Sequence, residues 1–130
     1  MIVVLAHGCF DVLHSGHLLH LREARKLGDR LVVSITADEF IHKGPGRPIF
    51  DQYERAAALR ELRCVDEVII SYCGGPEASL RSVMPNIYVK GKEYEGRLTE
   101  AGLVEALGGK VVFLHHPKGS LIHSRDFALR

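Results

Sequence analysis

Apolar positions along this chain fall into short runs rich in β-branched residues, separated by stretches with helical periodicity. Runs of this length and composition are typical of buried strands. The strands predicted in this way cover residues 2–6, 31–36, 65–71, 87–89 and 111–114. Because strand and helix alternate throughout, we expect an α/β domain in which a five-stranded parallel sheet is covered by helices on both faces.

Capping and breaking residues mark the ends of the intervening helices. Asp51 is a typical N-cap with Glu54 three residues later, Pro76 opens a helix, and Gly28 follows the end of one. The predicted helices cover residues 17–27, 51–62, 76–83, 99–107 and 124–130. No repeat or linker interrupts this order, so residues 1–130 are predicted to form a single Rossmann-like, doubly wound domain. Such sheets bind ligands beyond the carboxyl ends of their strands, where strand order reverses. The loops after the first, second and fourth strands and the start of the last helix should therefore converge.

Composition and charge narrow the classes of partner. The chain has 17 basic and 16 acidic side chains and a net charge of +1, which gives no support to a nucleic-acid-binding surface or a polybasic membrane anchor. Its three cysteines lack C-x-x-C spacing, which favours a reducing compartment, and the apolar run at residues 2–6 is too short for a signal peptide or membrane span. We therefore expect a cytoplasmic protein.

The turn after the first strand carries the candidate chemistry. It reads GCFDVLHSGH over residues 8–17 and matches neither the dinucleotide-binding nor the Walker-type glycine pattern. His14 and His17 are three residues apart at the mouth of a helix, so both imidazoles lie on one side of the first turn. Gly16 leaves room for a phosphate to approach backbone N–H groups. The residues alone leave two interpretations open, a phosphate site and a polar turn with an incidental helix cap.

The turn resembles the signature of the cytidylyltransferase-like nucleotidyltransferases, an H-x-G-H motif preceded by G-x-F-D. Further segments resemble those that follow in family members, namely RKLGDRLVVSITADEF, YERAAAL, CVDEVI and VKGKEY. The chain is similar to glycerol-3-phosphate cytidylyltransferases and to the adenylyltransferase domain of bifunctional heptose-phosphate enzymes. The resemblance implies a HIGH-type nucleotidyltransferase that moves CMP or AMP from a nucleoside triphosphate to a small phosphorylated alcohol or sugar and releases pyrophosphate.

The resemblance also implies roles for individual residues. His14, His17 and Lys43 correspond to the catalytic positions, and Arg55 to a position that grips the acceptor phosphate. Nucleotide-binding positions are Gly8, Cys9, Phe10, Asp11, Gly16, Lys90, Gly91, Glu93, Ser124 and Arg125. The competing interpretation of Lys43, Arg55 and Glu93 is a solvent-exposed charge, and contact between Arg47 and a ligand is left open.

The last segment departs from the family pattern. Family members usually begin their last helix with a Ser-Thr-rich motif, whereas Ser124 here lacks neighbouring threonines and is followed by Arg125. Ser124 is expected to act as a cap or phosphate donor, with Arg125 supplying charge. The departure leaves CTP and ATP as competing nucleotides.

Other expectations follow from the reaction. The attacking phosphate oxygen is already ionised at neutral pH, so positioned donors and cations are needed rather than a general base. Mg²⁺ is expected with the triphosphate, while His115 and His116 have no spacing typical of a protein metal site. The resemblance makes a homodimer possible. The alternative function is a nucleotide-binding regulatory module that has lost turnover; an aminoacyl-tRNA synthetase core is excluded by length and by the missing basic surface.

Overall fold

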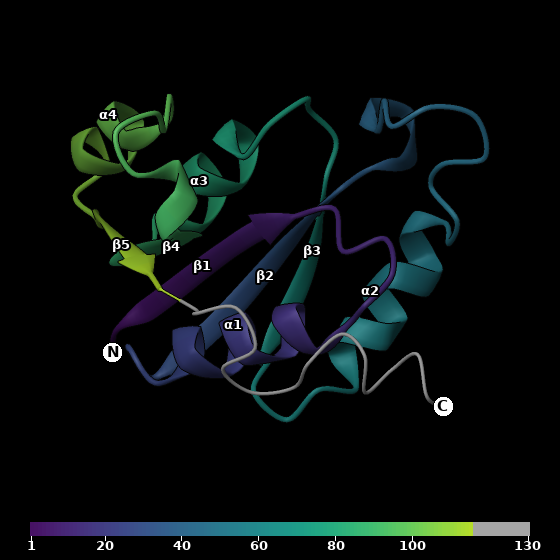
Figure 1. Ribbon diagram of the computed structural model, residues 1–130. Helices are drawn as coiled ribbons and strands as arrows, with labels where there is room; N and C mark the ends of the chain where they lie inside the picture. Colours follow the sequence, from purple (N-terminus) through teal and green to yellow (C-terminus); the bar gives the residue numbers. More distant parts are fainter. Residues whose placement is uncertain (116–130) are drawn as a thin grey trace.

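The computed structural model describes residues 1–115 and forms one twisted, fully parallel sheet with helices on both faces (Figure 1). Its strands are β1 (Val3–Gly8), β2 (Arg30–Thr36), β3 (Glu67–Ser71), β4 (Ile87–Gly91) and β5 (Lys110–Leu114). Its helices are α1 (Ser15–Arg25), α2 (Gln52–Arg60), α3 (Glu77–Val83) and α4 (Ala101–Ala106), with short 3₁₀ turns η1 (Asp38–Phe40) and η2 (Lys92–Tyr94). The predicted helix at 124–130, with Ser124 and Arg125, lies outside the described residues. The α/β fold class and the five-stranded parallel sheet predicted from the sequence are confirmed.

Strand order is β3-β2-β1-β4-β5. Strands β2 and β3 are added in turn on one side of β1, and β4 and β5 are then added on its other side. The switch point of this doubly wound sheet therefore lies between the carboxyl ends of β1 and β4. Register places Ala6 beside Val33 on one side and beside Val89 on the other. The residues that follow β1 and β4 must consequently meet, although more than 80 positions separate them in the sequence.

Alternation along the central strand divides the interior into two cores. Val4 and Ala6 point to the face covered by α1 and α2, where they join Leu21 and Leu59. Leu5 points to the opposite face, where its cluster includes Leu80 of α3 and Val104 of α4. Every helix that packs on the sheet thus buries one apolar side. None of the helices in residues 1–115 is long and apolar enough to cross a membrane.

Several element boundaries differ from those predicted. β1 runs two residues beyond 6 to include His7 and Gly8, and β4 runs to Gly91, so both glycines end strands instead of lying in loops. The first helix begins at Ser15, two residues before His17, because His14 is its N-cap. Asp51 caps α2 as predicted, with its side chain accepting a hydrogen bond from the backbone N–H of Glu54 at 2.8 Å.

Gly28 has a packing role that the sequence did not indicate. The helix before it already ends at Arg25, and a Cβ at Gly28 would lie 2.7 Å from the carbonyl oxygen of Ile2 and 2.9 Å from Cγ2 of Val4. Glycine is therefore needed here because the loop between α1 and β2 crosses directly over the start of β1.

Replacing Gly28 by alanine should lower the free energy of unfolding by about 1–3 kcal/mol, since backbone and core atoms must shift to admit the methyl group. Gly74→Ala is the matched control because a Cβ there meets no atom within 4 Å. Urea denaturation of both variants measures the difference. Equal stabilities for the two variants would contradict the packing role of Gly28.

Candidate active site at the β1–β4 switch point

The turn between β1 and α1 is held by a capping box built from two histidines. The His14 ring accepts a hydrogen bond at Nδ1 from the backbone N–H of Gly16 at 3.0 Å, and the His14 backbone N–H donates to Nδ1 of His17 at 3.3 Å. The two rings stack with centroids 3.9 Å apart. A Cβ on Gly16 would lie 2.8 Å from Cε1 of His14, so glycine is needed for this ring to fold over the turn.

This capping box fixes the protonation of both rings. A ring nitrogen that accepts a backbone N–H cannot carry a proton, so the neutral form of His14 and His17 is protonated at Nε2. Burial, followed by the charges of His14 and Lys43, lowers the pKa of His17 to about 4, against the smaller opposing effect of a hydrogen bond between its ring and the Val12 backbone. At neutral pH His17 is therefore an uncharged Nε2–H donor. The sequence left two interpretations of this turn open, a helix cap and a phosphate site. The same two rings can serve both, because the cap uses only one nitrogen of each ring.

Two adjoining cavities open above the switch point. The larger has a volume of about 600 Å³ and the smaller about 400 Å³. Seven residues line both: His7, Gly8, Cys9, Phe10, His17, Lys90 and Tyr94. The larger cavity extends to Asp11, Val12, His14, Thr36, Lys43 and Arg47, and the smaller to Gly16, His20, Gly91 and Glu93. The structure therefore brings together side chains from the segments after β1, β2 and β4.

Positive charge is concentrated on these walls. Lys90 donates from Nζ to the carbonyl oxygen of His7 at 3.3 Å and lies 4.9 Å from the centre of the Tyr94 ring. Burial lowers the pKa of Lys90, and the carboxylates of Glu100 and Glu93 act against this shift. A polyanionic ligand would therefore meet a partly desolvated ammonium group at the junction of the cavities.

Asp11 is directed at the protein's own backbone. Its carboxylate accepts hydrogen bonds from the N–H groups of Ile49 and Phe50 at 2.8 and 3.1 Å and from Arg47 at 3.0 Å. Burial alone would raise the pKa of Asp11, but the donors from Ile49, Phe50 and Arg47 outweigh it and hold that pKa below its usual value. Asp11 thus fastens the loop that carries Lys43 and Arg47 to the histidine turn. A direct contact between Asp11 and nucleotide stays a prediction.

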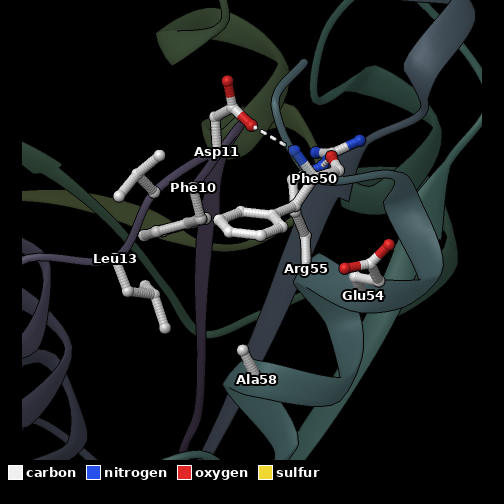
Figure 2. A pocket seen from close by; sticks show the side chains of 8 residues that line it. Phe10, Asp11, Leu13, Phe50, Glu54, Arg55 and Ala58 are labelled. Atoms are coloured by element: carbon white, nitrogen blue, oxygen red, sulfur yellow. Dashed lines mark hydrogen bonds between the residues drawn. The ribbon is translucent and has the colours of Figure 1, made fainter. Parts of the chain in front are cut away.

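Arg55 lies beneath the same turn and is 2% exposed. It donates to the carbonyl oxygens of Cys9 at 2.8 Å and Phe50 at 3.1 Å, and it forms an ion pair with Asp38 at 2.7 Å. Figure 2 shows it beside Phe10 and Phe50 on the wall of a third cavity of about 340 Å³. The exposed-helix interpretation of Arg55 is wrong, because its guanidinium is buried against these carbonyls. Its predicted contact with acceptor phosphate stays untested.

A metal site made by protein side chains alone would need several ligands close together. Residues 1–115 contain no group of three or more histidine, cysteine, aspartate or glutamate side chains arranged to hold an ion. Gly91 leaves space for the Glu93 carboxylate, which a Cβ at Gly91 would strike. Glu93 is exposed and lines the smaller cavity, so the structure combines its two predicted settings.

His17 should make stability depend on pH. The unfolded chain takes up a proton there near pH 6.5 and the folded chain only near pH 4, so the free energy of unfolding should fall as pH drops from about 6.5 to 4. His17→Asn should remove part of this fall. His42→Asn, which changes an exposed histidine in the next loop, should retain it. Urea denaturation across this pH range tests the assignment, and identical pH profiles for the two variants would contradict it.

Similarity to known proteins identifies the family. The model of the cytidylyltransferase-like family matches residues 5–116. The bifunctional protein HldE of Streptomyces coelicolor is 44% identical over 120 residues, covering 90% of this chain and 26% of that protein. HldE of Pseudomonas fluorescens is 45% identical over 115 residues, covering 86% and 24%. The chain thus spans about a quarter of the length of these relatives.

Two solved structures resemble this chain in fold. A lipopolysaccharide core biosynthesis protein from Thermoplasma volcanium superimposes with a TM-score of 0.72 at 37% identity, covering 88% of this chain and 95% of that one. Pantothenate synthetase from Thermus thermophilus has a TM-score of 0.60 at 17% identity, covering 91% and 57%, and shares the fold alone. The chain belongs to the cytidylyltransferase-like family, which confirms the family resemblance found in its sequence.

Proposed function

We propose that this domain transfers AMP from ATP to a sugar phosphate and releases pyrophosphate. The observation that carries the proposal is the histidine capping box, which places the His14 and His17 rings on the wall of a cavity that Lys43 and Lys90 also line. Uncharged donors and fixed cations at one wall suit a triphosphate, whose charge must be supported as the bond to the leaving pyrophosphate breaks.

The choice of nucleotide and acceptor has support from the relatives. The segments KGPGRP and VKGKEY resemble heptose-type adenylyltransferases more than glycerol-phosphate enzymes. The HldE proteins of Streptomyces coelicolor and Pseudomonas fluorescens match most of this chain at 44% and 45% identity, and the Thermoplasma relative is named for lipopolysaccharide core biosynthesis. Both favour ATP and a sugar phosphate over CTP and an alcohol phosphate. The alternative of a module without turnover has no support from these relatives.

The reaction needs positioning more than proton transfer. An oxygen of the acceptor phosphate forms a bond to the α-phosphorus, and the bond between that phosphorus and the oxygen leading to the β-phosphate breaks. The attacking oxygen carries its negative charge beforehand, so no base is required. Lys43 and Arg47 line the larger cavity and His17 lines both cavities, so these side chains are placed to orient the reacting phosphates.

Mg²⁺ bound to the triphosphate would neutralise charge on the leaving group. Asp11 and Glu93 are the carboxylates that line the two cavities in the described chain. Asp11 is engaged by backbone and arginine donors, which leaves Glu93 as the side chain able to hold such an ion beside the phosphates. The cavity walls suit an ion that enters with the nucleotide, and Mg²⁺ stays a prediction.

Pyrophosphate release should be measured with each nucleoside triphosphate against a panel of sugar and alcohol phosphates. We expect ATP with a sugar phosphate to give the fastest release. His17→Ala should lower turnover at saturating substrate by about 10²-fold or more, because one positioned donor is lost. His42→Ala is the matched control. Nucleotide binding without release for every pairing would refute the proposed activity, and unchanged turnover in the His17 variant would refute the role of its ring.

Arg55 allows a second test, which separates acceptor binding from support of the turn. Arg55→Lys should lower the free energy of unfolding by about 1–3 kcal/mol, since a lysine cannot reproduce donation to Cys9, Phe50 and Asp38 together. Arg60→Lys, at an exposed position of the same helix, should change stability little. A raised KM for the acceptor with unchanged stability would instead support the acceptor role predicted from the sequence.

A further inference from the structure

His7 is a third histidine at the junction of the two cavities, and the sequence motif does not include it. It is the penultimate residue of the central strand β1, next to Gly8, and it lines both cavities. Besides His17 and Lys90, it is the nitrogen-bearing side chain common to both linings. If the nucleotide and the acceptor occupy adjoining cavities, the phosphate that passes between them must lie against this shared wall.

The environment of His7 determines which ring nitrogen carries its proton. Nδ1 makes a hydrogen bond with the hydroxyl of Ser34, directly beside it in the register of β1 and β2. Ser34 is fully buried, and the His7 ring is the partner of its hydroxyl within residues 1–115. A buried hydroxyl proton needs an acceptor, so we assign Ser34 as donor and Nδ1 as acceptor. The proton of the neutral ring is therefore on Nε2.

The Nε2–H group is only loosely engaged by the protein. Its neighbour is the hydroxyl of Thr36 at 3.4 Å, at the long end of the hydrogen-bond range, and Thr36 itself lines the larger cavity. Burial and the charge of Lys90 lower the pKa of His7 to about 4, with Glu100 acting in the opposite sense. The ring is thus neutral at physiological pH and can exchange a weak contact for a stronger one to an anionic oxygen.

From this arrangement we propose that His7 is a catalytic residue whose Nε2–H donates to an oxygen of the reacting phosphate. The inference rests on the proposed nucleotidyl transfer. It adds to the two motif histidines a third donor, which approaches from the sheet and not from the helix. Ser34 then acts as a positioning residue, because its hydroxyl holds the ring in the tautomer that donates. Donors on two sides of one phosphate would constrain its orientation as well as support its charge.

Two variants, each of which keeps a polar group near one of the two ring nitrogens, separate this role from simple packing. His7→Asn places an amide where Nδ1 was and keeps a partner for Ser34, but it has no donor at the cavity. His7→Gln places its amide near the position of Nε2 and keeps that donor. We expect His7→Asn to lower kcat by about 10-fold or more with little change in KM for the triphosphate, and His7→Gln to restore most of the loss. His42→Asn serves as the matched control.

A spectroscopic measurement tests the contact independently of turnover. In ¹⁵N-histidine-labelled wild-type protein, the Nε2 resonance of His7 should shift when a non-hydrolysable ATP analogue is added with a sugar phosphate. An unchanged His7 resonance, or wild-type turnover in His7→Asn, would overturn the proposal. Equal losses of kcat in His7→Asn and His7→Gln, together with equally lowered melting temperatures, would also overturn it, because they would show that the ring only supports the structure. Absence of pyrophosphate release by the wild type would instead refute the proposed function, while the resonance would still report on the contact.

Discussion

The reciprocal hydrogen bonds between His14 and His17 are the interaction on which the site depends. A helix N-terminus leaves backbone N–H groups without partners, and here side-chain imidazoles satisfy part of that need. In most capping boxes a hydroxyl and a carboxylate share this task. Imidazoles add a second ring nitrogen, so one arrangement caps the start of the helix and lines the cavity. The His14 ring folds over Gly16 and stacks on the His17 ring, which constrains both rings.

The turn that carries these histidines is held from below by buried charges. Arg55 donates to the Cys9 carbonyl, while the Asp11 carboxylate holds the following loop through Ile49 and Phe50. Phe10, between them, adopts a positive φ of 50° and packs edge-on against His17. Left-handed backbone is costly for such a side chain and persists where surrounding contacts determine it. These contacts come from three segments, so the geometry of the turn is a property of the assembled domain.

The distribution of charge explains how a nearly neutral protein can bind polyanions. The chain as a whole carries +1, yet three cations, Lys43, Arg47 and Lys90, line the larger cavity. Its lining includes one carboxylate, Asp11, whose charge is directed at backbone N–H groups and Arg47. The proposed affinity for phosphate would therefore arise from the local placement of these side chains and not from the net charge. Neutral histidines complement these cations because they donate without adding repulsion between like charges.

The sequence by itself determined the fold class, the number of strands and the position of the histidine turn, because local apolar periodicity and an unusual motif encode them. It could not show that His7 lies at the same site, since a histidine ending a strand has no distinctive spacing. Nor could it show that Arg55 is buried, because helical periodicity does not reveal which carbonyls a long side chain reaches. Only the tertiary structure decided these points: strand pairing places β1 between β2 and β4, and that pairing sets which side chains share a cavity.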